Sequence, residues 1–245
     1  MRRSTSLAVM VLTLGVTGAR AQQTPPVQSG REVKWVRDSE EYATIARWVY
    51  RTAAQSVQDQ IARVPRGQPW AVVLDVDETA LDNTAYELER RAYGQPHDEA
   101  VFAAWIARRE SGVVPGASTF IAAVRRLGGR VVWITNRFEV TRANTQENLV
   151  IRGLWGDGDH LCLRNPADSA YTKAARRAEV LRGGGACGFD QPASVLAYVG
   201  DQLGDFPQAG EPDPDAGREE AIGARFFLLP DPMYGAWERA PNRRR

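Results

Sequence analysis

The sequence feature that most constrains this chain is an apolar run that ends in two carboxylates. Ala71-Val-Val-Leu74 leads directly into Asp75-Val-Asp77-Glu-Thr79. An uninterrupted apolar run of this kind is typical of a parallel strand buried on both faces. Because a buried and unpaired carboxylate costs free energy, acidic residues at the end of such a strand indicate a function. Ligands of open α/β sheets bind beyond the carboxyl ends of the strands, so we expect Asp75 and Asp77 at the functional site.

Two more apolar runs end in polar residues. One is 130–135, which continues into Asn136, and the other is 194–200, which continues into Asp201 and Asp205. Helical patterns and shorter strands lie between and around these runs. The predicted helices are 38–64, with a capping box from Asp38 to Glu41, 117–127, 140–152 and 169–181, and the predicted short strands are 161–163 and 225–229. This alternation predicts an α/β fold with a central parallel sheet flanked by helices.

Residues from about 80 to 113 interrupt the alternation. The segment has a helical pattern and is rich in charged and aromatic residues, including Tyr86 and Trp105. We therefore expect a small, mostly helical cap inserted over the site. His97 is an isolated histidine in this segment, and we expect a surface or hydrogen-bonded side chain rather than a ligand.

Length and composition are those of a globular protein with one large domain and a small accessory one. The chain has 245 residues, of which 43% are hydrophobic and 25% charged. Its net charge of +1 gives no reason to expect a nucleic-acid polymer as partner. Lysine is rare, since only Lys34 and Lys173 occur among 31 basic residues. This rarity favours a required compact charge at Lys173.

The N-terminus has the pattern of a secretory signal. Residues 1–21 combine Arg2 and Arg3 with a short apolar core and an Ala19-Arg-Ala21 cleavage site. We expect residues 22–37 to be a flexible lead-in, 38–238 the main domain and 239–245 a basic tail. The mature protein is then secreted or periplasmic and soluble, without a stable membrane anchor. Its oligomeric state, including a homo-oligomer, is left open.

Three other groups of residues have alternative interpretations. Cys162 and Cys187 are either a disulfide or two separate buried thiols. The segment 157–160 contains two aspartates and a histidine, and we expect a solvated turn rather than a metal site. Arg176 and Arg177 are expected to be charges on a helix surface.

The strand ends and the 169–181 helix supply polar side chains to one edge of the sheet: Asp75, Asp77, Thr135, Asn136, Lys173, Asp201 and Asp205. So many carboxylates repel one another unless a cation lies among them. Oxygen ligands without His or Cys favour Mg²⁺. A hydroxyl and an ammonium, from Thr135 and Lys173, would then bind the oxygens of a substrate phosphate.

The two carboxylates after the first strand are suited to different steps. Asp75 can attack phosphorus and form an aspartyl-phosphate. Asp77 can protonate the leaving alcohol and then activate water. This chemistry predicts hydrolysis of a small phosphate monoester.

These motifs resemble those of the haloacid dehalogenase-like (HAD) phosphatases, and in detail those of the secreted class C acid phosphatases, which are related to plant acid phosphatases. The resemblance covers about residues 38–238 and rests on motifs in the same order, namely 75–83 (Asp-Val-Asp-Glu-Thr-Ala-Leu-Asp-Asn), 114–116 (Val-Pro-Gly), 134–137 (Ile-Thr-Asn-Arg), 199–206 and 229–238. It implies a Rossmann-like core with a small cap and Mg²⁺-dependent phosphomonoesterase activity.

The resemblance also implies roles for individual residues. Asp75 is the nucleophile and a metal ligand, and Asp77 is the acid/base whose backbone carbonyl binds the metal. Asp201 is the third metal ligand, while Thr79 and Asp205 are supporting residues. Thr135, Asn136 and Lys173 bind phosphate, and Tyr86 and Tyr234 match positions at which some members stack the base of a nucleoside monophosphate. For these two tyrosines, core packing remains an alternative.

Two other functions are compatible with the same fold. One is a non-catalytic storage or binding protein, a kind of relative that can lose the first aspartate, which this chain keeps as Asp75. The other is phosphoryl transfer to an acceptor alcohol instead of water, which the same intermediate permits.

Overall fold

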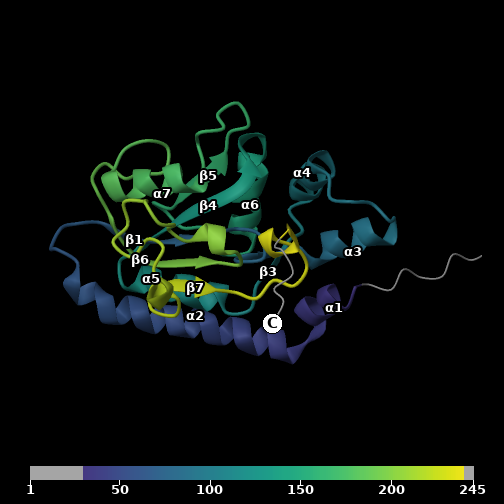
Figure 1. Cartoon of the computed structure of the whole chain (residues 1–245), viewed down its shortest axis with the longest axis horizontal. Coiled ribbons are helices and arrows are strands. Elements are labelled where there is room, and N and C mark those ends of the chain that lie inside the picture. Colours follow the sequence, from purple (N-terminus) through teal and green to yellow (C-terminus); the bar gives the residue numbers. More distant parts are fainter. Residues whose placement is uncertain (1–29, 240–245) are drawn as a thin grey trace, which may run out of the picture.

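A parallel five-stranded sheet forms the centre of the molecule. The computed structural model describes residues 30–239, and its main sheet has the order β5-β4-β1-β6-β7 (Figure 1). The strands are β1 (Trp70–Leu74), β4 (Arg130–Phe138), β5 (His160–Arg164), β6 (Ser194–Gly200) and β7 (Phe226–Leu228). All four neighbouring pairs are parallel. The predicted α/β class with a central parallel sheet is confirmed.

The central strand β1 lies at the point where the chain changes direction across the sheet. After β1 the chain adds β4 and β5 on one side, then returns to add β6 and β7 on the other. Leu74, the last residue of β1, pairs with Trp133 of β4 and Val199 of β6. The three strands therefore end near the same level, and the residues that follow them meet in one crevice.

Helices cover both faces of the sheet (Figure 1). Helices α2 (Glu40–Gln60) and α5 (Ala117–Arg126) pack on one face, and α7 (Lys173–Arg182) packs on the other. Val72 and Leu74 of β1 belong to the first core, while Ala71 and Val73 belong to the second. Helix α6 (Arg142–Ile151) contacts β5 at the sheet edge. Both faces of β1 are thus buried, which explains its continuous apolar run.

Regular secondary structure begins at Arg31, before the predicted start of the main domain at residue 38. Residues 31–37 were assigned to a flexible lead-in, but Arg31–Asp38 form helix α1, with Val33 and Val36 buried. The assignment is wrong from residue 31 because these two valines pack into the core and α1 contacts the cap helix α3. Ser39, rather than Asp38, caps the next helix, since its Oγ accepts a hydrogen bond from Tyr42 N at 3.1 Å.

The cap consists of two helices on a small hairpin. Strands β2 (Leu81–Asp82) and β3 (Gly112–Val113) pair antiparallel at its base. Between them lie α3 (Thr84–Ala92) and α4 (Glu99–Arg108), which extend beyond one end of the sheet (Figure 1). The insertion therefore contains the helices that were expected of it.

Five short 3₁₀ helices complete the described elements: Ile61–Arg63, Glu139–Thr141, Leu203–Asp205, Glu219–Ala221 and Ala236–Arg239. Helix α7 begins at Lys173, four residues later than predicted, because Thr172 is its N-cap. Within residues 30–239 no helix combines the length and the apolar character needed to cross a bilayer. The predicted signal segment 1–21 and residues 240–245 of the predicted tail lie outside the described residues.

Candidate active site

Three aspartates from two strand ends form a compact carboxylate cluster. Asp75 follows β1, Asp201 follows β6, and Asp205 lies on the 3₁₀ turn after it. One carboxylate oxygen of each lies within 4.8 Å of the other two. Only glycine fits at position 200, because a Cβ there would overlap the Asp205 side chain. The end of β6 thus lets Asp205 fold back toward Asp75.

Lys173 inserts its ammonium group into this cluster. It is the first residue of α7, and its Nζ lies 2.9 Å from Asp75 Oδ1 and 2.6 Å from Asp205 Oδ1. Burial would lower the pKa of Lys173, but these two carboxylates raise it above the ordinary value, so the lysine stays charged. Lys173 is therefore not a surface lysine.

The cluster carries more negative charge than Lys173 can balance. Burial raises the pKa of Asp75 to about 7 despite Lys173, and the carboxylates of Asp205 and Asp77 add to the rise. Burial, Asp205 and Asp75 likewise raise the pKa of Asp201 well above its usual range. Three carboxylates beside one ammonium suit a hard divalent cation, which would remove this repulsion. The donor set, all oxygen, fits such an ion.

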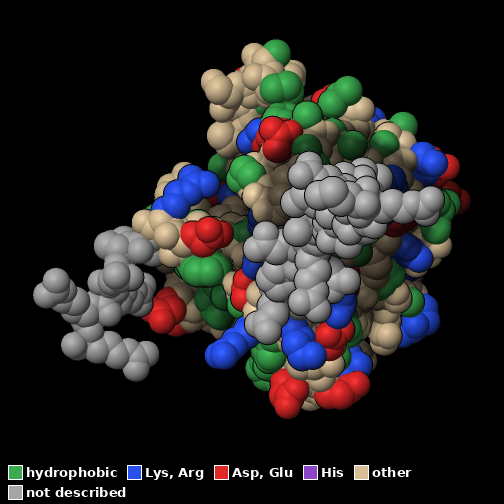
Figure 2. All heavy atoms as spheres, turned by 90° about the vertical axis from the view of Figure 1, so that its right-hand side faces the viewer, with side chains coloured by type: hydrophobic (Ala, Val, Ile, Leu, Met, Phe, Trp, Pro, Cys, Tyr) green, Lys and Arg blue, Asp and Glu red, His purple; other side chains and the backbone are tan. Residues whose placement is uncertain are grey.

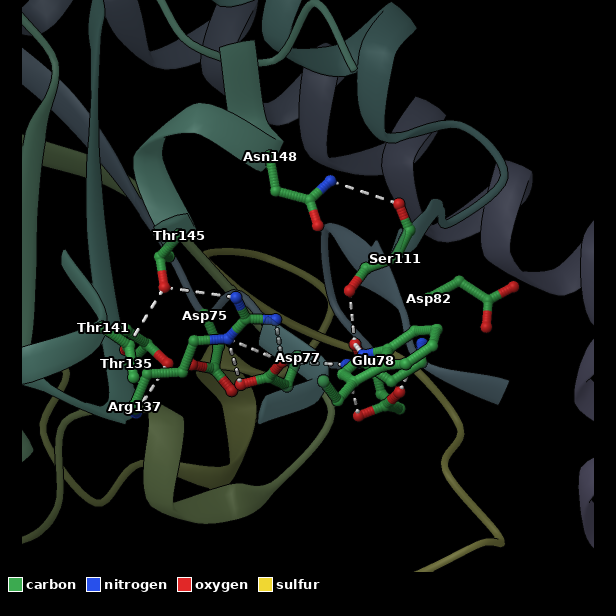
Figure 3. Close-up of polar contacts among 12 residues, drawn as sticks. Asp75, Asp77, Glu78, Asp82, Ser111, Thr135, Arg137, Thr141, Thr145 and Asn148 are labelled. Carbon is green, nitrogen blue, oxygen red and sulfur yellow. Dashed lines mark hydrogen bonds and ion pairs between the residues drawn. The ribbon is translucent and has the colours of Figure 1, made fainter. Parts of the chain in front are cut away.

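The cluster differs in one member from the predicted metal ligands Asp75, Asp77 and Asp201. Asp205 lies in it, whereas the Asp77 carboxylate is turned toward Arg137 (Figure 3). Only the Asp77 backbone carbonyl, the group that the family resemblance implies, is left to serve as a ligand. Thr79, the other predicted supporting residue, donates from Oγ1 to Asp201 Oδ1 at 3.0 Å.

Arg137 and Asn83 hold the carboxylate of Asp77. Arg137 donates to Asp77 Oδ1 from Nη2 at 2.7 Å and from Nε at 3.0 Å, and reaches Oδ2 from Nε at 3.1 Å. Asn83 Nδ2 donates to the same Oδ1 at 2.8 Å. The Asp77 side chain remains 15% exposed, so it can be reached from the cavity. The two aspartates therefore have different cationic partners.

Thr135 and Asn136 of β4 have different surroundings. Thr135 is fully buried, and its Oγ1 accepts a hydrogen bond from Arg137 N at 3.1 Å. Asn136 is exposed and lines the cavity. The predicted strand ends at Thr135, but β4 continues to Phe138, so both residues lie within the strand, close to its end.

A cavity of about 710 Å³ opens over the cluster. Asp75, Asp77 and Asp201 form part of its lining, the cap contributes Tyr86, and the C-terminal segment contributes Tyr234. Tyr86 packs against Phe102 with ring centroids 5.0 Å apart and an interplanar angle of 53°, and its hydroxyl lies 3.2 Å from His97 Nδ1. Tyr234 donates its phenol hydrogen to the carboxylate of Glu78. Both tyrosines predicted from the sequence thus border the same cavity.

Basic and acidic side chains are interspersed on the face toward which the cap extends (Figure 2). On the part of this face formed by described residues, no continuous field of one sign is visible. This distribution matches the net charge of +1.

Two predicted surface arginines are in fact buried, so that prediction is wrong. Arg176 is 1% exposed and donates from Nη1 to the carbonyls of Thr135 and Cys162, at 2.5 and 2.8 Å. Arg177 is 3% exposed and pairs with Glu211 at 2.6 Å. The reason is that α7 turns this side toward the strand ends and the loop after β6, where carbonyl and carboxylate oxygens need donors.

The turn at 156–160 is less solvated than expected, because Asp159 is buried. Its carboxylate accepts hydrogen bonds from Arg125 at 2.6 Å and from the backbone N of Gly156 at 3.0 Å. Asp159 therefore stabilises the turn and is not a member of the cluster formed by Asp75, Asp201 and Asp205. Of the two alternatives for the cysteines, the structure has the Cys162–Cys187 disulfide. His97 is exposed and hydrogen-bonded, as expected.

Sequence reasoning missed Glu78, Asn83 and Asp231. Glu78 is 3% exposed and has a left-handed backbone with φ of 55°. Asn83 is 1% exposed and touches both Asp77 and Glu78. Glu78 and Asn83 belong to the 75–83 motif, which was the available signal. The sequence contains no such signal for Asp231, because the burial of its side chain depends on how the C-terminal segment packs against the rest of the domain.

Several known proteins are similar to this chain in sequence or in fold. A family model described as HAD superfamily, subfamily IIIB (acid phosphatase) matches residues 2–237. Acid phosphatase 1 from Solanum lycopersicum is 29% identical over 165 residues, which cover 66% of this chain and 57% of that protein. The stem 31 kDa glycoprotein from Glycine max is 25% identical over 171 residues, covering 66% and 58%. The chain thus spans little more than half the length of these curated relatives.

Solved structures show the same fold. The class C acid phosphatase from Bacillus anthracis has a TM-score of 0.72 at 24% identity, with 87% of each chain covered. Its tungstate-bound structure has a TM-score of 0.71 at 23% identity, covering 87% of this chain and 88% of that one. The resemblance inferred from the motifs is therefore confirmed. Because the family model spans nearly the whole chain, this protein belongs to the acid phosphatases of HAD subfamily IIIB, a family of phosphoric monoester hydrolases.

Proposed function

We propose that this chain is a Mg²⁺-dependent acid phosphatase that acts on small phosphate monoesters through an aspartyl-phosphate at Asp75. The observation that carries the proposal is the position of Asp75. Its carboxylate lies at the cavity, 2.9 Å from the Lys173 ammonium and within the Asp201–Asp205 cluster. A nucleophile that attacks an anion needs such positive charge nearby, since otherwise the two negative groups repel each other.

The first step transfers the phosphoryl group to the enzyme. An oxygen of Asp75 forms a bond to phosphorus while the bond to the alcohol oxygen breaks. The electron pair goes to that oxygen, which takes a proton from Asp77. Asp77 lines the same cavity, and Arg137 and Asn83 fix its carboxylate.

The second step returns Asp75 to its free form. Asp77, now ionised, takes a proton from water as the water oxygen attacks phosphorus, and inorganic phosphate leaves. Lys173 supports both steps because its charge lies beside the oxygens that carry the phosphoryl group. The proposed neutral phosphate contacts are Thr135 and Asn136 of β4.

The metal site is proposed at Asp75, Asp201 and the backbone carbonyl of Asp77, with Asp205 in support. The ion would supply positive charge to the phosphate oxygens. The chain's own contribution is to hold three buried carboxylates within 4.8 Å, which only a cation makes favourable.

Nucleoside monophosphates are the substrates that the cavity favours within this class. Tyr86 and Tyr234 border it from the cap and from the C-terminal segment. Tyr86 is 4% exposed and packed among cap side chains, so Tyr234 is the ring on which a base could stack. We also propose export by residues 1–21 and function in an oxidising compartment, in which the Cys162–Cys187 disulfide would be stable.

The test is phosphate release by the mature protein from nucleotides, sugar phosphates and aryl phosphates, between acid and neutral pH. We expect turnover that a chelator abolishes and added Mg²⁺ restores. Asp75→Asn should leave the circular dichroism spectrum unchanged and remove activity on every substrate. Residual turnover near the wild-type rate in Asp75→Asn would rule out the nucleophile. Unchanged phosphate release after chelation would rule out the metal.

A further inference from the structure

We propose that Asn83 is a positioning residue that fixes the Asp77 carboxylate according to where the cap lies. The proposal rests on the function proposed above, in which Asp77 is the acid/base. Asn83 stands between β2 and α3, at the point where the chain enters the cap, and is 1% exposed. Its amide group contacts the core on one side and the cap on the other.

The cap side determines which way the amide points. Asn83 Oδ1 accepts hydrogen bonds from Trp105 Nε1 at 2.9 Å and from Ser111 Oγ at 2.7 Å. The indole N–H can only donate, so an oxygen must face it. The amide therefore cannot flip, and its NH₂ group must face the opposite side, which is the core.

On the core side the NH₂ group meets two carboxylates. Asn83 Nδ2 donates to Asp77 Oδ1 at 2.8 Å and lies 3.4 Å from Glu78 Oε2. The backbone N of Asn83 donates to Glu78 Oε1 at 2.9 Å, which fixes the Asn83 main chain as well. A single side chain thus joins the cap helix α4 to the residues after β1.

This contact makes the two oxygens of Asp77 unequal. Oδ1 accepts hydrogen bonds from Asn83 Nδ2 and from two nitrogens of Arg137, whereas among residues 30–239 Oδ2 accepts one from Arg137 Nε alone, at 3.1 Å. Three donors leave Oδ1 no room for a further partner. We infer that Oδ2 is the oxygen that exchanges a proton with the substrate, and that Asn83 together with Arg137 determines this choice.

From Asn83 the network reaches Ser111 at the base of the cap. It continues from Ser111 to Asn148 of the core helix α6 (Figure 3). The carbonyl of Ser111 accepts from Arg152 Nε at 2.7 Å and from Asn148 Nδ2 at 3.3 Å. Trp105, the other donor to Asn83, is 3% exposed and packs beside Tyr86 on the cavity wall. A movement of α4 would therefore change the hydrogen bond at Asp77.

The experiment compares two substrates that differ in their need for an acid. An alkyl phosphate has a poor leaving group that must be protonated, whereas p-nitrophenyl phosphate has a good one. For Asn83→Ala we expect kcat/KM to fall about 100-fold on the alkyl phosphate and less than about tenfold on the aryl phosphate. Trp105→Phe keeps an aromatic ring and loses only the N–H, so it should shift the ratio the same way by about threefold to tenfold.

Asp98→Ala is the matched control. Asp98 caps α4 through Ala100 N and Val101 N, at 2.8 and 3.0 Å, and does not touch the Asn83 network. The substitution frays only the exposed first turn of α4, seven residues before Trp105, and should leave the alkyl-to-aryl ratio of kcat/KM unchanged. Equal losses on both substrates in Trp105→Phe, or a shifted ratio in Asp98→Ala, would overturn the proposal.

The wild-type protein separates this inference from the proposed function. If it releases no phosphate from either substrate with Mg²⁺ present, the proposed function itself has failed. If it is active and the Asn83→Ala protein does not fold, Trp105→Phe still decides the outcome.

Discussion

Two carboxylates separated by one residue acquire different properties here because their neighbours differ. Asp75 faces Lys173 and two other aspartates, whereas Asp77 faces Arg137 and Asn83. A strand end places both at one edge of the sheet, but only the residues brought there by β4, β6 and α7 distinguish them. The proposed nucleophile and the proposed acid/base therefore differ through their tertiary contacts and not through their spacing alone.

Asp231 leads to a prediction about pH and stability. Burial raises its pKa to about 7, against a hydrogen bond from Met233 N, and Glu87 and Glu238 raise it further. The folded protein therefore holds this proton more tightly than the unfolded chain. Since the folded state binds more protons between about pH 4 and pH 7, stability should fall as the pH rises through this range.

The test is to remove the charge with Asp231→Asn. Urea unfolding at pH 7.5 should show the variant about 1–2 kcal/mol more stable than wild type, and the difference should shrink toward zero at pH 4. The variant keeps an oxygen for Met233 N, so no other contact is lost. The same change at Asp190, an exposed aspartate, serves as the control. A difference that does not depend on pH would contradict the assignment.

The site residues that could be predicted are those that follow strands. Asp75, Thr135 and Asp201 were identifiable because an apolar run that ends in a polar side chain is a local signal. Glu78 belongs to the 75–83 motif, but the motif does not reveal its burial, which depends on a hydrogen bond from Tyr234 of the C-terminal segment. Long-range partners leave no local pattern.

At the scale of elements, helix α7 lies between the carboxylate cluster, which Lys173 contacts, and the segment that carries Cys187 of the disulfide. Lys173 at its start reaches Asp75, and Arg176 one turn later donates to the carbonyls of Thr135 and Cys162. Arg176 Nε also donates to Thr172 O within the helix, at 3.2 Å. Burial lowers the pKa of Arg176 to about 10, which still leaves it charged at neutral pH. Its three acceptors are all backbone carbonyls.

Arg176→Met should therefore be strongly destabilising. The substitution leaves the carbonyls of Thr135 and Cys162 without their donor. Each hydrogen bond to a buried charged group contributes about 1.5–3 kcal/mol. We expect a loss of about 3 kcal/mol or more in the free energy of unfolding measured with urea. Arg182→Met is the matched control, because Arg182 lies on the same helix and is exposed. It should change the free energy by less than about 0.5 kcal/mol, and similar losses in both variants would argue against the role of Arg176.

The order and type of the elements could be predicted better than their ends. The three long apolar strands and the helices between them follow from periodicity, which survives in any context. Helix α1 was missed because only Val33 and Val36 carry its apolar face, and eight residues are too few for a clear pattern. The start of α7 was placed too early because Thr172 acts as its cap only after residues 165–171 form turns.

At the scale of the whole molecule, the Cys162–Cys187 disulfide ties the edge strand β5 to the connection between α7 and β6. It closes a segment with a sequence separation of 25, and both cysteines are buried. The enclosed segment contains Lys173 and Arg176, so the cross-link restricts the chain that carries Lys173, the proposed phosphate ligand. The sequence could not choose between a disulfide and two thiols, because the choice depends on β5 and the loop after α7 lying side by side.

Reduction of this disulfide should destabilise the protein without removing the site. A cross-link with this separation lowers the entropy of the unfolded chain and contributes about 3 kcal/mol. We expect this loss in the free energy of unfolding when the protein is refolded in the presence of a reductant and unfolded with urea. The double variant Cys162→Ala/Cys187→Ala should have the stability of the reduced protein and should not respond to reductant. Because the ion pairs of Lys173 with Asp75 and Asp205 do not involve the cysteines, the reduced protein should still turn over at temperatures at which it is folded. Equal stability of the oxidised and reduced proteins would show that β5 and α7 hold this part of the fold together without the cross-link.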